Sequence, residues 1–278
     1  MEFVRTSPTF RRRRLARRIR RLREGAGLTQ EQAAASLDMS TSALSRKETG
    51  EVATSVHEVR SMMDLYDAYE PGLVDLARSA KAKPWWHAYG IIDRGYFDLE
   101  EEAASIREWQ FSFVPGIFQT EDYARRVFEG AGVLEAGDIE NAVAARMRRR
   151  NRLHDHDAPL SFSAVVDESV LRRPVGDSSL MRGQLLKLLE CMDIPNVTLQ
   201  VLPLVEGAHR GVEGSFTLLS YADVDERDIL FLEHAAGSLH VDKPEAVSAA
   251  MSTFERLRAK ALNGKNSAAL IGRLMSDC

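Results

Sequence analysis

The chain has 278 residues, of which 44% are hydrophobic and 28% are charged, and its formal net charge is −4. This composition is ordinary for a folded globular protein and excludes a chain that is mostly disordered. No window approaches the roughly 18 apolar residues of a membrane helix, and the basic N-terminus lacks the apolar core of a signal peptide, so we expect a cytoplasmic protein with no membrane partner.

Charge is distributed unevenly along the chain. Residues 1–60 carry 13 Lys and Arg against 7 Asp and Glu, which gives +6, whereas the remaining residues carry 24 against 34, which gives −10. A basic segment joined to an acidic body is typical of a phosphate-binding module attached to a separate domain, because phosphates that are neutralised release counterions. The length also favours two domains. A solvated charge run is the alternative explanation.

The first predicted helix contains a dense run of arginines. Leu15, Ile19 and Leu22 recur at spacings of four and three, which predicts an amphipathic helix with one apolar stripe. Gly25 and Gly27 are expected to end it, because glycine readily adopts the left-handed conformation. The basic outer face is expected to comprise Arg11 to Arg14, Arg17, Arg18, Arg20, Arg21 and Arg23. A solvated arm without a specific function is the alternative interpretation of the run.

Two short helices joined by a tight turn are predicted next, in the stretch LTQEQAAASLDMSTSALSRKETG, residues 28–50. Thr29 and Gln32 have the spacing of a capping box at the start of the first of them. Asp38 is expected at the turn, because Asp is one of the few residues other than glycine that tolerate a positive φ. Ser40 is expected to cap the second helix.

The second of these helices has an inward apolar residue, Leu44, and a polar outer face. This arrangement predicts a helix-turn-helix whose recognition helix enters the major groove of double-stranded DNA. Hydroxyl groups and arginine can read base edges, so we assign base contacts to Thr41, Ser42, Ser45 and Arg46. We assign phosphate contacts to Gln30, Ser40, Arg17 and Arg21. A helical hairpin with no role in DNA binding is the alternative.

The same segment resembles the DNA-binding domain of Xre-type regulators, which include Cro and the phage repressors. The resemblance rests on L-T-Q at residues 28–30, on Ala34 and Leu37 at the helix crossing, and on S-R-x-E-x-G at residues 45–50. Two positions depart from the pattern: Ala33 stands where a larger aliphatic is usual, and Lys47 replaces the expected apolar residue. The helix interface is therefore expected to be thinner unless the aliphatic stem of Lys47 packs along it.

A further helix from Ser55 to Tyr69 is predicted from apolar residues at helical spacing, and the pattern continues after Pro71. Residues 81–84 have the character of a linker, because the pattern fades and proline disfavours helix in the residue before it. We therefore predict a DNA-binding domain over residues 1–80 and a linker over 81–97.

The body of the protein, residues 98–278, is predicted to be an α+β domain. A helix is expected over residues 98–113, with Ile106, Trp109 and Phe113 as its buried stripe. Further helices are expected near residues 120–128, 138–153, 178–192 and 243–262, and from 267 onwards. Four alternating segments, LSFSAVVDE, VTLQVLPL, GSFTLLSY and ILFLEH, are strand candidates. Helices around a small mixed or antiparallel sheet follow from this order.

The C-terminal domain resembles that of a large actinobacterial group of Xre-type regulators. The motifs are V-P-G-I-F-Q-T-E-x-Y-A-R at 114–125, R-x-x-R at 146–149, E-S-V-L-R-R-P-V-G at 168–176, Q-V-L-P at 200–203 and G-S-F at 214–216. The resemblance implies a developmental or antibiotic-related transcription regulator. Such a regulator often works beside a small acidic partner protein, in a pairing that has been likened to antitoxin and toxin.

No sequence pattern of a phosphate loop, a zinc protease or a nucleophile elbow is present, and we expect neither enzymatic activity nor a cofactor. His154 to Asp157 is the best metal candidate, with a hydrated turn as the alternative. Asp167 and Glu168 could perform acid–base chemistry, or Glu168 could cap a helix or pair with an arginine. The arginine run 146–152 could bind phosphates or an acidic protein, or could form a solvated helix face. Candidate partner or effector contacts are Arg146, Arg149 and Glu168.

Three hypotheses follow. The first is a homodimeric, sequence-specific transcription regulator whose C-terminal domain binds an effector or a small partner protein; two half-sites about one helical turn apart multiply the specificity of a small helix-turn-helix. The second is an antitoxin-like interaction protein that sequesters a small acidic partner and autoregulates its operon. The third, an enzyme with an attached DNA-binding module, lacks a catalytic constellation in the sequence.

Overall fold

The computed structural model of the chain describes residues 10–91, 95–132, 134–223 and 226–278. The chain divides into two compact units, Met1–Trp85 and Trp86–Cys278. Residues 92–94 of the predicted linker, and the first nine residues of the predicted DNA-binding domain, lie outside the described residues.

The first unit is helical. Its helices are α1 (Phe10–Gly25), α2 (Gln30–Ser36), α3 (Thr41–Glu48), α4 (Val56–Leu65) and α5 (Pro71–Lys81). One side chain from each of the first three lies at the centre, namely Leu15, Ala33 and Leu44, and all three are at most 1% exposed. Ala33 and Ala34 are small enough for a neighbouring helix to approach α2 closely. The unit therefore has one core, to which all of these helices contribute.

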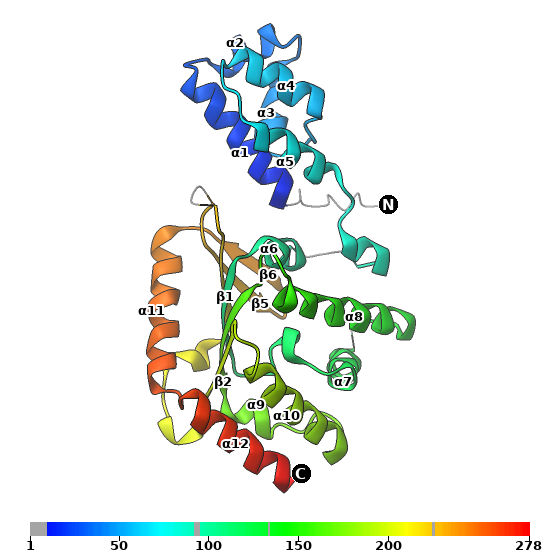
Figure 1. Cartoon of the computed structure of the whole chain (residues 1–278), viewed down its shortest axis with the longest axis vertical. Helices are drawn as coiled ribbons and strands as arrows, with labels where there is room; N and C mark the ends of the chain where they lie inside the picture. Colours follow the sequence, from blue (N-terminus) through cyan, green and yellow to red (C-terminus); the bar gives the residue numbers. More distant parts are fainter. Residues whose placement is uncertain (1–9, 92–94, 133, 224–225) are drawn as a thin grey trace. The chain divides into compact units, whose positions relative to one another are not determined.

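The second unit contains a six-stranded mixed sheet (Figure 1). The strands have the order β3-β2-β1-β4-β5-β6, in which β1, β2 and β3 are parallel and the β1–β4, β4–β5 and β5–β6 pairs are antiparallel. Their bounds are β1 Ser105–Gln110, β2 Ser161–Asp167, β3 Val197–Leu202, β4 Phe216–Ser220, β5 Ile229–His234 and β6 Gly237–Val241. The predicted fold class, a helical N-terminal domain followed by an α+β domain, is confirmed.

Helices cover both faces of this sheet. They are α6 (Tyr96–Glu102), α7 (Glu121–Ala131), α8 (Ala136–Arg149), α9 (Glu168–Arg172), α10 (Ser178–Met192), α11 (Pro244–Lys260) and α12 (Gly264–Asp277), with short 3-10 turns η1 to η5 between elements. Figure 1 shows α11 on one side of the sheet and α8 on the other. Trp109 and Val165 face α11 and pack with its Phe254. On the opposite face, Phe162 of β2 contacts Phe118 of η2 (Gly116–Phe118).

The predicted helix over residues 98–113 is wrong. The α6 helix ends at Glu102, and Ser105–Gln110 is instead β1, the central strand, which pairs with β2 and β4. Ile106 and Trp109 have helical spacing, but in the strand they point to opposite faces and each enters a different half of the core. Pairing with strands that are distant in the sequence therefore overrides the local pattern.

The other predicted elements agree with the structure to within a few residues. All four strand candidates are strands, and α10 has the predicted bounds. The α8 helix ends at Arg149, and the last turn of the predicted helix is the 3-10 turn η3 (Arg150–His154). The edge strand β6 was not predicted, because its exposed polar residues show little apolar alternation.

Candidate nucleic-acid interface

The α2–turn–α3 segment is held by its own capping groups. The Thr29 hydroxyl accepts the Gln32 N–H at 3.2 Å, and the Gln32 side chain accepts the Thr29 N–H at 2.9 Å, which completes the predicted capping box. Asp38 has a φ of 52° at the turn. Ser40 Oγ then accepts the Ala43 N–H at 3.2 Å and starts α3. The local sequence thus fixes the start of each helix and the turn between them.

Gly50, after α3, is required for two reasons. Its φ is +78°, a conformation that side chains rarely adopt, and an added Cβ would lie 3.3 Å from the backbone Cα of Arg13 in α1. The chain can therefore leave α3 directly against α1. The glycine of the S-R-x-E-x-G motif sets the distance between these two helices.

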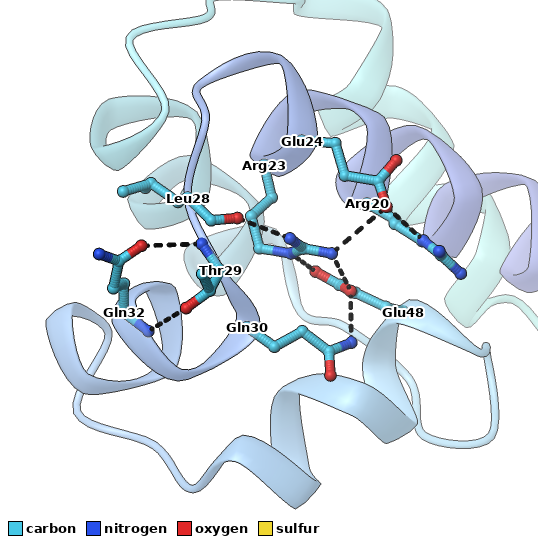
Figure 2. Close-up of polar contacts among 8 residues, drawn as sticks. All are labelled: Arg20, Arg23, Glu24, Leu28, Thr29, Gln30, Gln32 and Glu48. Atoms are coloured by element: carbon cyan, nitrogen blue, oxygen red, sulfur yellow. Dashed lines mark hydrogen bonds and ion pairs between the residues drawn. The ribbon is translucent and has the colours of Figure 1, made fainter.

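A buried ion pair joins α1 to the end of α3 (Figure 2). Arg23 donates from Nε and Nη2 to the two carboxylate oxygens of Glu48, at 2.7 and 3.0 Å. Its Nη1 donates to the Leu28 carbonyl at 2.7 Å, and Gln30 Nε2 donates to Glu48 Oε2 at 2.8 Å. The hydrogen bonds that Arg23 donates to Glu48 raise the pKa of Arg23. One carboxylate thus connects α1, α3 and the N-terminus of α2.

This network corrects the sequence analysis, which placed Arg23 on the basic outer face. Arg23 is 6% exposed and Glu48 is 5% exposed. A signal was available, because Arg23 follows Ile19 by four residues and therefore continues the apolar stripe of α1. Glu48 likewise follows Leu44 by four residues in α3. A charged residue at an inward position of each of two neighbouring helices indicates a buried pair.

The four predicted base contacts lie on one side of α3. Ser42 and Arg46 are exposed, and Thr41 and Ser45 are half-buried. Ser42 Oγ lies 3.1 Å from the capping hydroxyl of Ser40, and Arg46 Nε donates a long 3.4 Å hydrogen bond to the Ser42 carbonyl. The opposite side of the helix carries Leu44, Lys47 and Glu48, which are all buried.

The predicted phosphate contacts come from α1 and from the start of α2 and α3. Arg17 and Arg21 are exposed on α1, one turn apart. Ser40 is exposed at the N-cap of α3, and Gln30 is half-buried at the first position of α2. The amide of Gln30 is oriented by Glu48, so its nitrogen is occupied within the protein.

Lys47 occupies its unusual position through specific partners. The residue is 8% exposed, and its Nζ donates to the Ala53 carbonyl at 3.2 Å and lies 2.9 Å from Glu58 Oε1. Glu58 also closes a capping box with Ser55 at the start of α4. The buried stem of Lys47 thus fills the helix interface, and its charge also ties α3 to α4.

The structure does not bring the three C-terminal candidate residues onto one surface. Arg149 is 9% exposed and donates two hydrogen bonds to Glu100, at 2.5 and 2.6 Å. Arg146 is half-buried, donates to Gln119 at 2.7 Å and stacks 4.1 Å above the Phe128 ring. Glu168 pairs with neither of these arginines.

The partners of Glu168 lie on α9 and on the loop after β3. Its Oε1 accepts Arg172 Nε at 2.8 Å, and its Oε2 accepts the Leu204 N–H at 3.0 Å. The preceding residue, Asp167, caps α9 by accepting the Ser169 N–H at 2.9 Å. Both carboxylates therefore have structural partners in this corner of the fold.

Glu108, which was not singled out from the sequence, is buried on the central strand near Arg149. It is 4% exposed and accepts a 2.7 Å hydrogen bond from Gln110 Nε2. Burial, together with the negative charges of Glu100 and Glu233, raises the pKa of Glu108 to about 7, although Gln110 and Arg149 oppose the shift. The alternation of β1 would have indicated this position, had the segment been recognised as a strand.

The structure also bears on the metal candidate at His154 to Asp157 and on the possibility of a membrane-spanning helix. The Asp155 carboxylate accepts the N–H groups of Asp157 and Ala158, at 3.1 and 3.2 Å, so the histidine-rich stretch forms a turn. Among the described residues, no three His, Cys, Asp or Glu side chains are grouped to hold a metal ion. None of the described helices is long and apolar enough to cross a membrane.

Comparison with known families assigns both parts of the chain. Residues 14–77, which include α2 and α3, match a helix-turn-helix domain. Residues 93–273 match a domain of unknown function, DUF5753. Neither a curated protein nor a solved structure shows significant similarity to the chain. The DUF5753 match covers more than half of the sequence, so the chain belongs to the DUF5753 family, and it carries the helix-turn-helix domain of a DNA-binding regulator ahead of that domain.

Proposed function

We propose that the protein is a sequence-specific transcriptional regulator that reads DNA with α3. One observation carries the proposal: α3 buries Leu44, Lys47 and Glu48 and leaves an opposite side of hydroxyl groups and one arginine, within a segment that matches a helix-turn-helix domain. Hydroxyl groups and arginine on one helix face can hydrogen-bond to the edges of bases in the major groove. The proposed base contacts are Thr41, Ser42, Ser45 and Arg46.

Arg46 is the residue expected to contribute most to specificity. Its side chain is exposed, and its only described hydrogen bond is the long one to the Ser42 carbonyl. Releasing this bond costs little, so the guanidinium is able to turn towards a guanine and donate to O6 and N7 together. Thr41, Ser42 and Ser45 would add hydroxyl contacts beside it.

Contacts to phosphates would hold α3 in register without reading sequence. Arg17 and Arg21 are exposed on α1, and Gln30 and Ser40 stand at helix N-termini, where backbone N–H groups favour an anion. The Arg23–Glu48 pair supports this arrangement by holding Gln30 in place. A homodimer on two half-sites would supply the rest of the affinity and specificity.

We assign to the C-terminal unit the binding of an effector or of a small partner protein, which would alter DNA affinity. The alternative is an antitoxin-like role, in which a small acidic partner is sequestered and DNA binding is autoregulatory. Exposed apolar side chains favour some binding role for this unit; they include Leu186, Leu204, Val205, Val212 and Leu239. Native mass spectrometry of the full chain captured from its host separates the alternatives, because a retained small protein and a retained small molecule differ in mass.

The DNA-binding proposal is tested by fluorescence anisotropy with a selected operator and with single-base variants of it. Arg46→Ala should cost about 1 to 3 kcal/mol on the operator and relax specificity at one position. Arg17→Ala should weaken binding to all sequences alike and reduce the dependence on salt. Arg60→Ala, an exposed arginine of α4, is the matched control and should change neither. A sequence-independent loss for Arg46→Ala would refute its assignment as a base contact.

A further inference from the structure

The C-terminal unit has a groove of about 580 Å³ where the parallel strands β2 and β3 end. Glu168 and Arg172 of α9, which directly follows β2, form one wall, and Pro203 and Val205, which follow β3, form another. The α12 helix lines the remaining side. The groove lies outside the carboxyl ends of these two parallel strands, and its volume is in the range of small-molecule sites.

About half of the groove lining is apolar. Leu270 and Leu274 of α12 are each 7% exposed at its base, and Leu262 lies beside them. Val205, which lines the same groove, is 89% exposed. An apolar ligand that covered Val205 would remove this surface from water, which is favourable in proportion to the area buried.

Two arginines line the same groove. Arg172 is held in place, because its Nε and Nη2 donate to Glu168 Oε1 at 2.8 and 2.7 Å. Arg273 of α12 is exposed and has neither a hydrogen bond nor an ion pair with any other described residue. The lining also contains two carboxylates. Glu168 accepts hydrogen bonds from Arg172 and from the Leu204 N–H, and Asp277 lies one helical turn beyond Arg273. A free guanidinium beside an apolar wall is suited to a carboxylate with an apolar body.

The groove wall that carries Val205 is already ordered before a ligand binds. The Leu204 N–H donates to Glu168 Oε2 at 3.0 Å, and further along the loop His209 Nε2 lies 3.6 Å from Asp167 Oδ2. The His209 ring also packs edge-on against Trp109, with 5.4 Å between ring centroids. The loop between β3 and β4 is thus attached at two points to the corner where β2 ends, so little order has to be gained on binding.

We propose that this groove is the effector site of the C-terminal unit and that it takes a small carboxylate with an apolar body. The anionic group lies at Arg273 and Arg172, and the apolar part covers Val205 and contacts Leu270 and Leu274. The regulatory meaning of the site rests on the proposed function, in which an effector alters DNA affinity. Binding of the ligand itself does not depend on DNA.

The test is calorimetric titration of the full chain, without DNA, with octanoate, octylamine and octan-1-ol, which share one apolar body. Octanoate is expected to bind at least about tenfold more tightly than either of the others. Arg273→Gln should weaken octanoate binding about tenfold, and Val205→Ser should weaken it by a similar factor. Arg182→Gln is the matched control, because Arg182 of α10 is also exposed and unpaired among the described residues.

The outcomes are decisive in either direction. Equal affinity for octylamine, no effect of Arg273→Gln beyond that of Arg182→Gln, or no binding of octanoate up to about 10 mM would overturn the proposal. Both substituted positions are exposed, so thermal unfolding of each variant should match that of the parent. Operator binding is then measured with and without octanoate. If octanoate does not bind, the Arg46 test of DNA recognition is unaffected. If the Arg46 test fails, the assignment of the groove as a carboxylate site is unaffected.

Discussion

Each unit of the molecule encloses a buried arginine–glutamate pair with nearly the same geometry but very different surroundings. In the helix-turn-helix unit, Arg23 and Glu48 meet through hydrogen bonds of 2.7 and 3.0 Å. The other hydrogen bonds are to neutral groups, because the Leu28 carbonyl accepts from Arg23 and the Gln30 amide donates to Glu48. The Glu24 carboxylate also lies 3.6 Å from Arg23 Nη2. The Glu24 side chain is 48% exposed, so within the core one cation faces one carboxylate, with hydrogen bonds on both sides.

The pair in the DUF5753 unit, Arg149 and Glu100, is surrounded by further charge. Its hydrogen bonds are 2.5 and 2.6 Å long, and the guanidinium lies 5.0 Å from the centre of the Tyr96 ring. Although burial opposes its charge, Glu100 raises the pKa of Arg149. Burial and the nearby Arg149 lower the pKa of Arg146, while the pKa of Glu108 is raised to about 7. The first pair fixes the position of helices, whereas the second belongs to a cluster whose stability depends on pH.

The largest effect is expected from removing Arg149. Arg149→Leu leaves Glu100 buried without its cation. It also removes the electrostatic attraction between Arg149 and Glu108. Breaking a buried pair typically costs about 3 to 5 kcal/mol. We expect about 5 kcal/mol here, because the Tyr96 hydroxyl, which also hydrogen-bonds to Glu100, is neutral and cannot replace the charge of Arg149. Hydrogen exchange with mass spectrometry on the full chain measures the loss, which should appear in peptides of β1 and α8.

The contrast between the units requires that this loss be local. Peptides of α1 to α5 should retain their protection in Arg149→Leu, and the exposed substitution Arg258→Leu in α11 should leave both units unchanged. Equal loss of protection in both units would mean that they unfold together, and the comparison between two independent pairs would then fail.

A smaller effect is expected from Arg23→Leu in the helix-turn-helix unit. Glu48 keeps the Gln30 amide as a donor, so we expect a loss of about 3 kcal/mol, at the lower end for a buried pair. Operator affinity should fall as well, because α3 loses its connection to α1. Hydrogen exchange of α1 to α5 and anisotropy titration measure the two effects.

The double variant Arg23→Leu/Glu48→Leu separates charge from packing. Replacing both members of a buried pair with apolar residues is often neutral or stabilising, so much of the lost stability should return. Operator affinity should not return with it, because Gln30 has lost its oxygen partner. Recovery of full operator affinity would show that the pair has no part in positioning Gln30.

An effect that reaches the size of that of Arg23→Leu only at high pH concerns Glu108. Its pKa in the folded state, about 7, lies above the ordinary 4.5, so the folded state binds the proton more tightly than the unfolded state. The stabilisation is fully present below about pH 4.5 and is lost as pH rises towards and through 7. Glu108→Gln cannot ionise, and at pH 8 it should exceed the parent by up to about 3 kcal/mol in unfolding free energy.

Urea denaturation at pH 4.5 and at pH 8 measures the difference. The two proteins should be nearly equal at the lower pH and diverge at the higher one. Glu255→Gln, at an exposed position of α11, should show no such divergence. A constant difference at both pH values would indicate a packing effect and not the titration of a buried carboxylate.

Sequence reasoning succeeded where the determining contacts are local. The capping box at Thr29, the positive φ at Asp38 and the N-cap at Ser40 each depend on atoms a few residues apart, and all were predicted. The four strands with clear alternation were found for the same reason. Turn and cap chemistry is thus readable from a single sequence.

The failures concern residues whose partners are distant in the sequence. Arg23 is separated from Glu48 by 25 residues and Arg149 from Glu100 by 49, and neither pair was inferred. The β1 strand was interpreted as a helix because its neighbours, β2 and β4, begin only at Ser161 and Phe216. The groove lined by Arg172 and Arg273 likewise combines residues from three separate segments.

The position of β1 also has a consequence for the order of events during synthesis. Its parallel neighbour begins at residue 161 and its antiparallel neighbour at residue 216, so the central strand is made long before either edge can be paired. The five helices of the first unit need only residues 10–81, and we expect them to fold as soon as they leave the ribosome. A nascent chain would then have a folded helix-turn-helix while the β1 segment, with Ile106 and Trp109, was still unpaired. We expect chaperones to be needed most during this interval, because these apolar side chains are exposed.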